Sequence, residues 1–431
     1  MKRRSIEGSK KSKNVFKERT SNRKSSYNAD NFVNKIIINT LNFGKKESKE
    51  GDGLSLDILK KEYDNYTEGE MSSKPFNIVK SWAANTYCGL LKNYNEDMYS
   101  VCEHITKPAN SKLKNWPKLS YFAIFDGHGG EECSKFFKNN FQNFLINNPS
   151  FPVDIKSSLQ SSIDKCEEAF NEEYKNNKAE KPEEIYDKSG SCVNVILICD
   201  NTIYIANVGD SRSIISMENG TKFKTLSIDH KPNNPKEFER VIKNGGKVYI
   251  DNDDPIRDIN KVKVIENEKE FDKYVDDKTV VYRIYPNDLA VARTVGDIIN
   301  KKKILGGNPN LLINTADVTI IDSSPHNDFI IMGCDGIFDM LSNKEIIDCA
   351  WYTIQNMSKE RKNDINLISL DICNMIIKNS MVKLSGDNLT CIVIGLEGLE
   401  KFLHNKENKE KINKALKERD ELLKKKKEDN K

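Results

Sequence analysis

Apolar segments that end on an aspartate are the feature of this sequence that most restricts its fold. Residues 121–130 read YFAIFDGHGG, so an apolar run stops at Asp126 and is followed by three glycines around His128. A short apolar run bounded by a glycine-rich turn is typical of a buried strand. An ionised carboxylate at the end of such a strand is costly unless a cation compensates it. The pattern therefore predicts a strand that carries Asp126 to a cation-binding site.

Three further segments combine an acid, a turn and an apolar strand. NYNEDMYS places Glu96 and Asp97 beside a short strand, GCDGIFDML places Asp335 after another, and SGDNLT places Asp387 before a third. In most of these segments no Lys or Arg is adjacent to the acid. Because the ligands are all oxygens, they favour Mg²⁺ or Mn²⁺ as the compensating charge. His128 is the lone imidazole in these motifs, which argues against zinc.

The residues beside Asp126 point to hydrolysis of a phosphate ester. Gly127 has no side chain, so its backbone can approach a metal closely enough for the carbonyl to bind it. Two metals that share one aspartate would hold a bridging water and lower its pKa toward neutrality, and that species can attack phosphorus. The leaving alkoxide needs a proton, which His128 can supply.

Alternating helical and strand patterns between residues 77 and 396 predict a mixed α and β domain. Residues 193–212 contain two apolar runs around Asp200 and Asn201, as in a hairpin. The segment NPKEFERVIKNGG predicts a helix with Pro235 in its first turn. The segment EECSKFFKNNFQNFL predicts another helix, whose apolar face contains Cys133, Phe137, Phe141 and Phe144. Hairpins within this mixture argue against an all-parallel doubly wound sheet.

Charge and cysteine usage limit the class of protein further. The 431 residues include 68 basic and 65 acidic side chains, a formal net charge of +3 that indicates no particular partner. We find no apolar run long enough to span a bilayer and no secretory signal. The ten cysteines are scattered singly, which is typical of reduced thiols. We therefore expect an intracellular protein, in the cytoplasm, the nucleus or both, without a nucleic-acid partner.

Eight segments resemble the metal-dependent serine/threonine protein phosphatases of the type 2C, or PPM, family. They are NED, FDGHGG, SGSC, ANVGDSR, DHKPNNP, LAVARTVGD, CDGIFD and GDNLT, and they span roughly residues 82–396 in the family's order. Each segment alone is a weak signal, but eight in order are specific. The resemblance implies an α+β fold, namely a four-layer α-β-β-α sandwich with two central antiparallel sheets flanked by helices.

The resemblance also implies a role for each acid. Asp126 would bridge two Mg²⁺ or Mn²⁺ ions, the carbonyl of Gly127 would bind one of them, and His128 would be the general acid. The resemblance places Glu96, Asp335 and Asp387 around the second metal. It implies that Asp97 orders metal-bound water. It places Asp229 and Asp339 at a third, weaker metal site. Whether that third site is occupied stays open.

The chain departs from the family in three places. The family usually has an arginine five residues before the aspartate of NED, as the ligand of the substrate phosphate, and Lys92 stands there in this chain. We expect Lys92 to bind that phosphate, with a solvated lysine as the alternative. The usual SGST is SGSC here, a change that we expect to concern packing at Cys192. Residues 251–281 form an enlarged version of the family's flap.

These observations predict three parts of the chain and one activity. Residues 1–75 form a basic, mostly disordered extension and linker, residues 76–397 the catalytic domain, and residues 398–431 a Lys/Glu-rich helical tail. We predict a monomeric protein serine/threonine phosphatase that acts on phosphoserine and phosphothreonine in protein substrates. Hydrolysis would use a metal-bridged hydroxide and no phosphoenzyme, because no Cys or Ser is placed as a nucleophile. The alternatives are a non-catalytic scaffold of the same fold, although no expected metal aspartate is missing, and another two-metal phosphoesterase.

Overall fold

The computed structural model describes residues 69–405, except residue 110 and residues 176–185, 252–261, 266–269, 272–279 and 359–360. The predicted basic extension, most of the predicted flap and nearly all of the predicted C-terminal tail lie outside these described residues. The described residues all fall within one compact unit, Asn65–Lys431.

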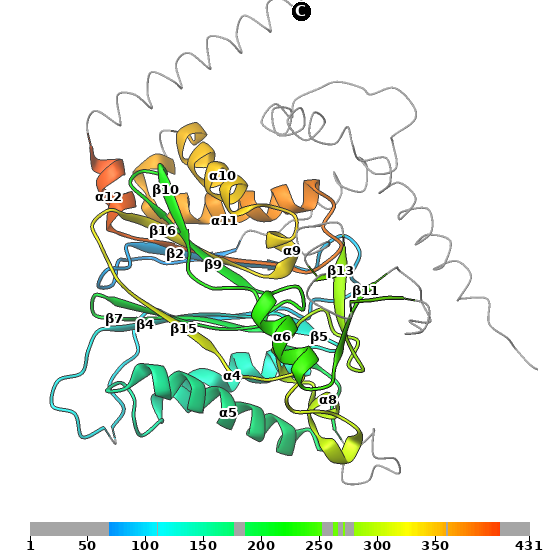
Figure 1. The fold of residues 1–431 in the computed structure, drawn as a ribbon. Coiled ribbons are helices and arrows are strands. Elements are labelled where there is room, and N and C mark those ends of the chain that lie inside the picture. The colour runs from blue at the N-terminus through cyan, green and yellow to red at the C-terminus, as the bar shows by residue number, and fades with distance from the viewer. Residues whose placement is uncertain are drawn as a thin grey trace, which may run out of the picture. The chain divides into compact units, whose positions relative to one another are not determined.

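Two antiparallel sheets form the centre of the domain (Figure 1). The six-stranded sheet has the order β1 (Glu70–Met71), β2 (Ser81–Tyr87), β17 (Leu389–Gly395), β16 (Asn327–Gly333), β9 (Arg212–Met217) and β10 (Lys222–Thr225). The five-stranded sheet has the order β15 (Asp317–Asp322), β8 (Thr202–Val208), β7 (Val193–Cys199), β4 (Leu119–Phe125) and β3 (Met98–Cys102). The predicted hairpin around Asp200 is confirmed as the turn between β7 and β8, with Asp200 at φ 51°.

Helices cover the outer face of each sheet (Figure 1). The six-stranded sheet carries α10 (Asn343–Asn356), α11 (Ile365–Val382) and α12 (Glu397–His404). The five-stranded sheet carries α4 (Glu132–Ile146) and α5 (Ile155–Glu173). The predicted four-layer α-β-β-α sandwich is therefore confirmed.

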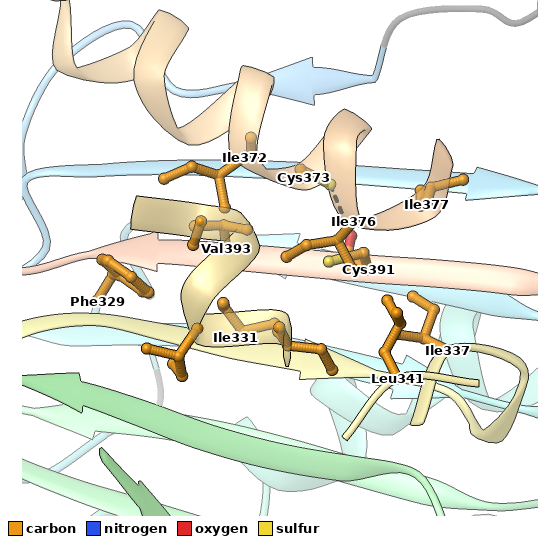
Figure 2. Close-up of a cluster of buried hydrophobic side chains, with 14 of the residues drawn as sticks. Phe329, Ile331, Ile337, Leu341, Ile372, Cys373, Ile376, Ile377, Cys391 and Val393 are labelled. Atoms are coloured by element: carbon orange, nitrogen blue, oxygen red, sulfur yellow. Dashed lines mark hydrogen bonds between the residues drawn. The ribbon is translucent and has the colours of Figure 1, made fainter. Parts of the chain in front are cut away.

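Three apolar cores separate the four layers. The central core lies between the sheets and includes Phe122, Ile196 and Ile392. One outer core packs α4 and α5 on the five-stranded sheet. Figure 2 shows the other, in which residues of α11 such as Ile376 pack against strand residues such as Val393. Because a strand buried on both faces favours apolar residues on both sides, the uninterrupted run YFAIF of β4 follows from its place in the five-stranded sheet.

Two small antiparallel sheets complete the architecture. The first joins β5 (Gly127–His128), β6 (Gly190–Ser191) and β14 (Val295–Gly296), three segments that are far apart in the sequence. The second joins β12 (Lys263–Ile265), β11 (Lys247–Asp251) and β13 (Val281–Tyr285) beside α6 (Pro235–Lys243) and its own apolar cluster. The remaining short helices are α8 (Ile298–Lys301), α9 (Asp335–Phe338), and the 3₁₀ turns η3 (Lys303–Leu305) and η4 (Arg361–Asn363).

The described strands and helices run from Glu70 to His404. Strand β1 pairs with β2, in register Glu70 with Ala84. At the other end, Leu399 of α12 is fully buried in the outer core over the six-stranded sheet. The bounds of the catalytic domain, residues 76–397, stay a prediction.

Candidate active site

The predicted metal-binding acids converge because antiparallel pairing brings the ends of paired strands together. Asp126 follows β4, and its partner strand β3 is preceded by Glu96 and Asp97. Asp335 follows β16 by two residues, and the partner strand β17 is preceded by Asp387. The backbone N–H of Asp335 donates to Oδ2 of Asp126 at 3.3 Å, which joins the acids of the two sheets into one cluster.

The segment before β17 holds the segment before β3 in place. The side chain of Asn388 accepts from the backbone N–H of Glu96 at 2.9 Å and donates to the carbonyl of Cys88 at 2.7 Å. Thr390 Oγ1 donates to Oδ2 of Asp97 at 2.7 Å. The motifs NED and GDNLT, nearly 300 residues apart, therefore form one unit.

Glycines permit this close approach of loops. A Cβ on Gly127 would lie 2.3 Å from the carbonyl oxygen of Glu96, and a Cβ on Gly336 would lie 2.0 Å from that of Asn388. Both distances are far below van der Waals contact. Any larger residue would push the acid-bearing loops apart, so glycine is needed beside Asp126 for space as well as for access to its carbonyl.

The central acids repel one another when ionised. Burial raises the pKa of Asp126 and of Asp335 well above the usual carboxyl range, and the neighbouring carboxylates raise both further. Burial, with Asp387 nearby, raises the pKa of Asp97 to about 7. Within the described part of the chain, none of these three forms an ion pair with Lys or Arg. A buried oxygen-rich group of this kind fits hard divalent cations such as Mg²⁺ or Mn²⁺, which would supply the missing positive charge.

Two lysines neutralise the outer acids. Lys92 Nζ lies 3.0 Å from Glu96 Oε2 and 2.9 Å from Asp387 Oδ1. Burial opposes its charged form, but these two carboxylates outweigh burial and raise the pKa of Lys92. Lys231 Nζ lies 2.5 Å from Asp339 Oδ1 and 3.5 Å from Oδ2 of a further buried acid, Asp210. The cluster is therefore charge-compensated at its rim and uncompensated at its centre.

The thiol of Cys192 lies within the acid cluster, next to Asp210. Ligand atoms of Asp126, Cys192 and Asp210 all lie within 4.8 Å of one another, a spacing that can hold a metal ion. The Cys192 thiol donates to Oδ1 of Asp210 at 3.2 Å. We expected the change from SGST to SGSC to concern packing. It also places the sulfur of Cys192, a soft metal ligand, beside Asp126.

His128 is held by an aspartate that is remote in the sequence. His128 Nε2 lies 2.8 Å from Oδ2 of Asp297, which is 4% exposed. Burial opposes the charged imidazolium, but Asp297 outweighs burial and raises the pKa of His128. A Cβ on Gly190 would lie 2.0 Å from Asp297 Oδ2 and 2.5 Å from His128 Nε2. The glycine of SGSC thus makes room for this pair, whose segments meet through the small sheet β14-β6-β5.

A sequence model described as Protein phosphatase 2C matches residues 91–389. The chain belongs to this family. It is 30% identical over 287 residues to a probable protein phosphatase 2C 3 of Paramecium tetraurelia, which covers 65% of this chain and 83% of that protein. It is 27% identical to the integrin-linked kinase-associated serine/threonine phosphatase 2C of Rattus norvegicus, over 69% of this chain and 68% of that protein.

A solved structure supports the same fold. The serine-threonine phosphatase 2C of Toxoplasma gondii matches with a TM-score of 0.52 at 18% identity, over 76% of this chain and 99% of that chain. The chain is thus a protein serine/threonine phosphatase, a hydrolase, as predicted, and the phosphatase 2C family implies metal-dependent catalysis. None of the helices in the described residues is long and apolar enough to cross a membrane.

The remaining predicted residues of this phosphatase 2C site are held by ion pairs. Arg212 donates to both oxygens of Asp229, from Nε at 2.8 Å and from Nη2 at 2.5 Å. Asp339 pairs with Lys231. A third metal at these two acids would have to displace the guanidinium of Arg212 and the ammonium of Lys231. The assignment of Asp229 and Asp339 to a third metal site stays a prediction.

Sequence reasoning missed Asp210 and Asp297. Both follow the dipeptide Val-Gly, in NVGD and TVGD, and both are buried. The signal that identified Asp126, an acid next to a glycine at the end of an apolar run, is present at both positions. The contacts of Asp210 with Cys192 and of Asp297 with His128 could not be predicted from the sequence, because only the folded sheets bring these residues together.

Proposed function

We propose that this phosphatase hydrolyses phosphoserine and phosphothreonine in proteins by direct attack of water on phosphorus, without a phosphoenzyme. The observation that carries the proposal is the buried carboxylate cluster whose central acids pair with no Lys or Arg of the described residues, beside a histidine held by Asp297. Two divalent cations would be held by the central acids and by the carbonyl of Gly127. The residues that would hold or order these cations are Asp126, Gly127, Glu96, Asp97, Asp335 and Asp387.

The bound cations would supply one part of the chemistry, and the side chains the rest. Divalent ions lower the pKa of water and withdraw charge from phosphoryl oxygens, so that water can attack phosphorus at neutral pH. His128, whose protonated form is favoured by Asp297, donates a proton to the leaving oxygen of serine or threonine. Lys92, at the rim between Glu96 and Asp387, offers its ammonium to the substrate phosphate.

The thiols of the site are unsuited to covalent catalysis. Burial, together with nearby acids, raises the pKa of Cys192 and of Cys334 well above the usual thiol range. A thiol of this kind stays protonated at neutral pH, and the thiolate is the nucleophilic form. This supports direct hydrolysis over a phosphocysteine route.

The proposal is tested by turnover of a phosphothreonine peptide in excess chelator and after addition of Mn²⁺ or Mg²⁺. We expect no turnover in chelator, recovery with either metal, and no effect of thiol alkylation. Full activity in excess chelator would contradict the mechanism.

Replacement of Lys92 tests the phosphate ligand. Lys92→Ala is expected to raise KM for the phosphopeptide roughly tenfold or more, since one charge-assisted hydrogen bond of about 1.5–3 kcal/mol is lost. Lys92→Arg is expected to keep or improve KM, because a guanidinium can make two parallel hydrogen bonds to phosphate. In both variants kcat should change little.

Two further measurements complete this test. Inhibition by inorganic phosphate should weaken in Lys92→Ala in parallel with substrate binding. Mn²⁺ binding to Lys92→Ala, measured by calorimetry without substrate, should tighten, because the ammonium no longer competes for Glu96 and Asp387. If KM and phosphate inhibition both stay at wild-type values, Lys92 is not the phosphate ligand and only pairs with Glu96 and Asp387.

Asp297→Asn tests the orientation of the general acid. Asn tolerates the left-handed backbone of Asp297, at φ 48°, so the fold should survive. The lost charge lowers the pKa of His128, so the protonated form disappears at lower pH than in the wild type. The alkaline limb of the kcat/KM profile for the phosphopeptide should therefore shift to lower pH, and kcat should fall roughly tenfold or more. An unchanged alkaline limb would show that Asp297 does not act through His128.

A further inference from the structure

Three exposed apolar side chains lie on the two loops that border the acid cluster. Leu91 is 43% exposed, Tyr94 55% and Leu384 50%. Leu91 and Tyr94 flank Lys92 in the loop before β3, and Leu384 lies three residues before Asp387 in the loop before β17. Exposed apolar residues gathered beside a site are a common feature of surfaces that bind a partner.

The two loops form one surface. The Asn388 side chain donates to the carbonyls of Cys88, at 2.7 Å, and Tyr94, at 3.2 Å. The ion pair of Lys92 with Asp387 adds a third connection. A Cβ on Gly89 would lie only 2.1 Å from the carbonyl oxygen of Asp387, so the backbones are in close contact. The backbones of the two loops are therefore held to each other beside the acids.

Tyr94 lies beside residues that we propose to hold the phosphoester. Its hydroxyl is 3.4 Å from Glu96 Oε1, and the same oxygen accepts from the backbone N–H of Gly130 at 2.8 Å. Gly130 is two residues after His128, and the other oxygen of Glu96 binds Lys92. Tyr94 is thus placed between the proposed phosphate ligand and the loop of the proposed general acid, with more than half of the residue open to solvent.

We propose that Tyr94, with Leu91 and Leu384, forms the contact surface for an apolar side chain within two residues of the phosphoserine or phosphothreonine. The inference rests on the proposed function, since it takes Lys92 and His128 as the groups that hold the phosphoester. A substrate segment whose phosphate reaches Lys92 passes Tyr94, and an apolar neighbour such as Leu or Phe removes exposed aromatic and aliphatic surface from water. An acidic neighbour would instead meet the negative charge of the cluster.

The experiment compares phosphothreonine peptides that carry Leu, Phe, Ala or Asp at each position from −2 to +2. Wild-type protein is expected to show roughly five- to tenfold higher kcat/KM for the best apolar peptide than for its alanine counterpart, as expected when about 1–1.4 kcal/mol of transfer free energy is gained. Tyr94→Ala is expected to reduce this ratio to near one, and Leu384→Ala to reduce it partly. Tyr94→Phe is expected to keep the ratio, because the ring makes the contact.

The ratio within each variant is the readout, so a change in overall activity does not decide the outcome. Tyr352→Ala, at a 41% exposed aromatic residue on α10, is the matched control and should keep both the wild-type activity and the wild-type ratio. The inference is overturned by a wild-type ratio near one, by an unchanged ratio in Tyr94→Ala, or by equal losses in Tyr94→Phe and Tyr94→Ala. A Tyr94→Ala variant that changes oligomeric state in sedimentation, without a change in ratio, would assign the surface to a second copy and also overturn it.

Loss of the proposed function and loss of the apolar preference would give different results. Absence of metal-dependent turnover on every phosphopeptide would remove the proposed function itself. Turnover on all peptides with no apolar preference would leave the proposed function intact and remove the role of Tyr94.

Discussion

Asp126→Asn is expected to lower kcat/KM for a phosphothreonine peptide by at least about a thousandfold, equivalent to roughly 4 kcal/mol of transition-state stabilisation. Asp126 is the acid through which both sheets meet, and its Oδ2 accepts from the backbone of Asp335. An amide has nearly the same shape as a carboxylate, but it lacks the charge that a divalent cation requires. Activity should therefore vanish while the fold is retained.

The same variant should be more stable than the wild type when both are metal-free. The raised pKa of Asp126 reflects burial and repulsion by neighbouring acids, chiefly Asp335. Asn removes one member of this group, so the melting temperature in chelator should rise. Addition of Mn²⁺ should raise the melting temperature of the wild type and not of the variant, because only the wild type gains free energy by binding the ion.

The pH dependence of the folding stability of the metal-free wild type tests whether repulsion among the buried acids destabilises the fold. Asp97 has its pKa raised from 3.8 to about 7, so the folded state binds its proton more tightly than the unfolded state does. The stability that this proton provides is fully present below pH 3.8 and is lost as pH rises through about 7. Mn²⁺ should reverse this loss of stability.

Asp322→Asn, at an exposed edge-strand residue, is the control for Asp126→Asn and should leave activity and the metal response unchanged. An unaltered metal response in Asp126→Asn would contradict the proposed site.

His128→Gln is expected to reduce kcat for a phosphoserine peptide roughly a hundredfold or more, within the range of general acid catalysis. The reduction for an activated aryl phosphate should be much smaller, because a nitrophenolate leaves without a proton. The glutamine amide can still donate to Asp297, so the segment around Gly190 should remain packed.

The pH profile separates loss of the acid from local distortion. In the wild type, Asp297 raises the pKa of His128, so the alkaline limb of the peptide reaction should lie at higher pH than it would for His128 without Asp297. His128→Gln should lack this limb. Equal losses on the peptide and on the aryl phosphate would count against a role as general acid.

The individual strands and helices could be predicted from the sequence because their signals are local, whereas the four-layer sandwich was predicted from the family resemblance. The apolar alternation and turn chemistry of residues 193–212 predict the β7-β8 hairpin without knowledge of any distant contact. Asp126 and Asp335 were accessible for the same reason, since each stands beside a glycine at the end of an apolar strand.

Which side chains pair with one another could not be predicted from local sequence patterns. Asp297 lies 169 residues from His128, and its identity as a partner depends on β14 and β5 both pairing with β6. The guanidinium of Arg212 on Asp229 and the ammonium of Lys92 between two acids likewise depend on rotamers and loop packing. Local patterns therefore identify groups with the right chemistry, whereas the folded sheets determine which of them act together.

The strand order of the six-stranded sheet has a consequence for the protein as it is made. β17, near the C-terminal end of the domain, lies between β2, near its start, and β16. A ribosome that has produced every residue up to Ser385 has already made Asp126, His128 and Asp335, but neither Asp387 nor the strand that joins the two halves of the sheet. We therefore expect the nascent chain to be unable to dephosphorylate nearby proteins until the last strand has left the exit tunnel.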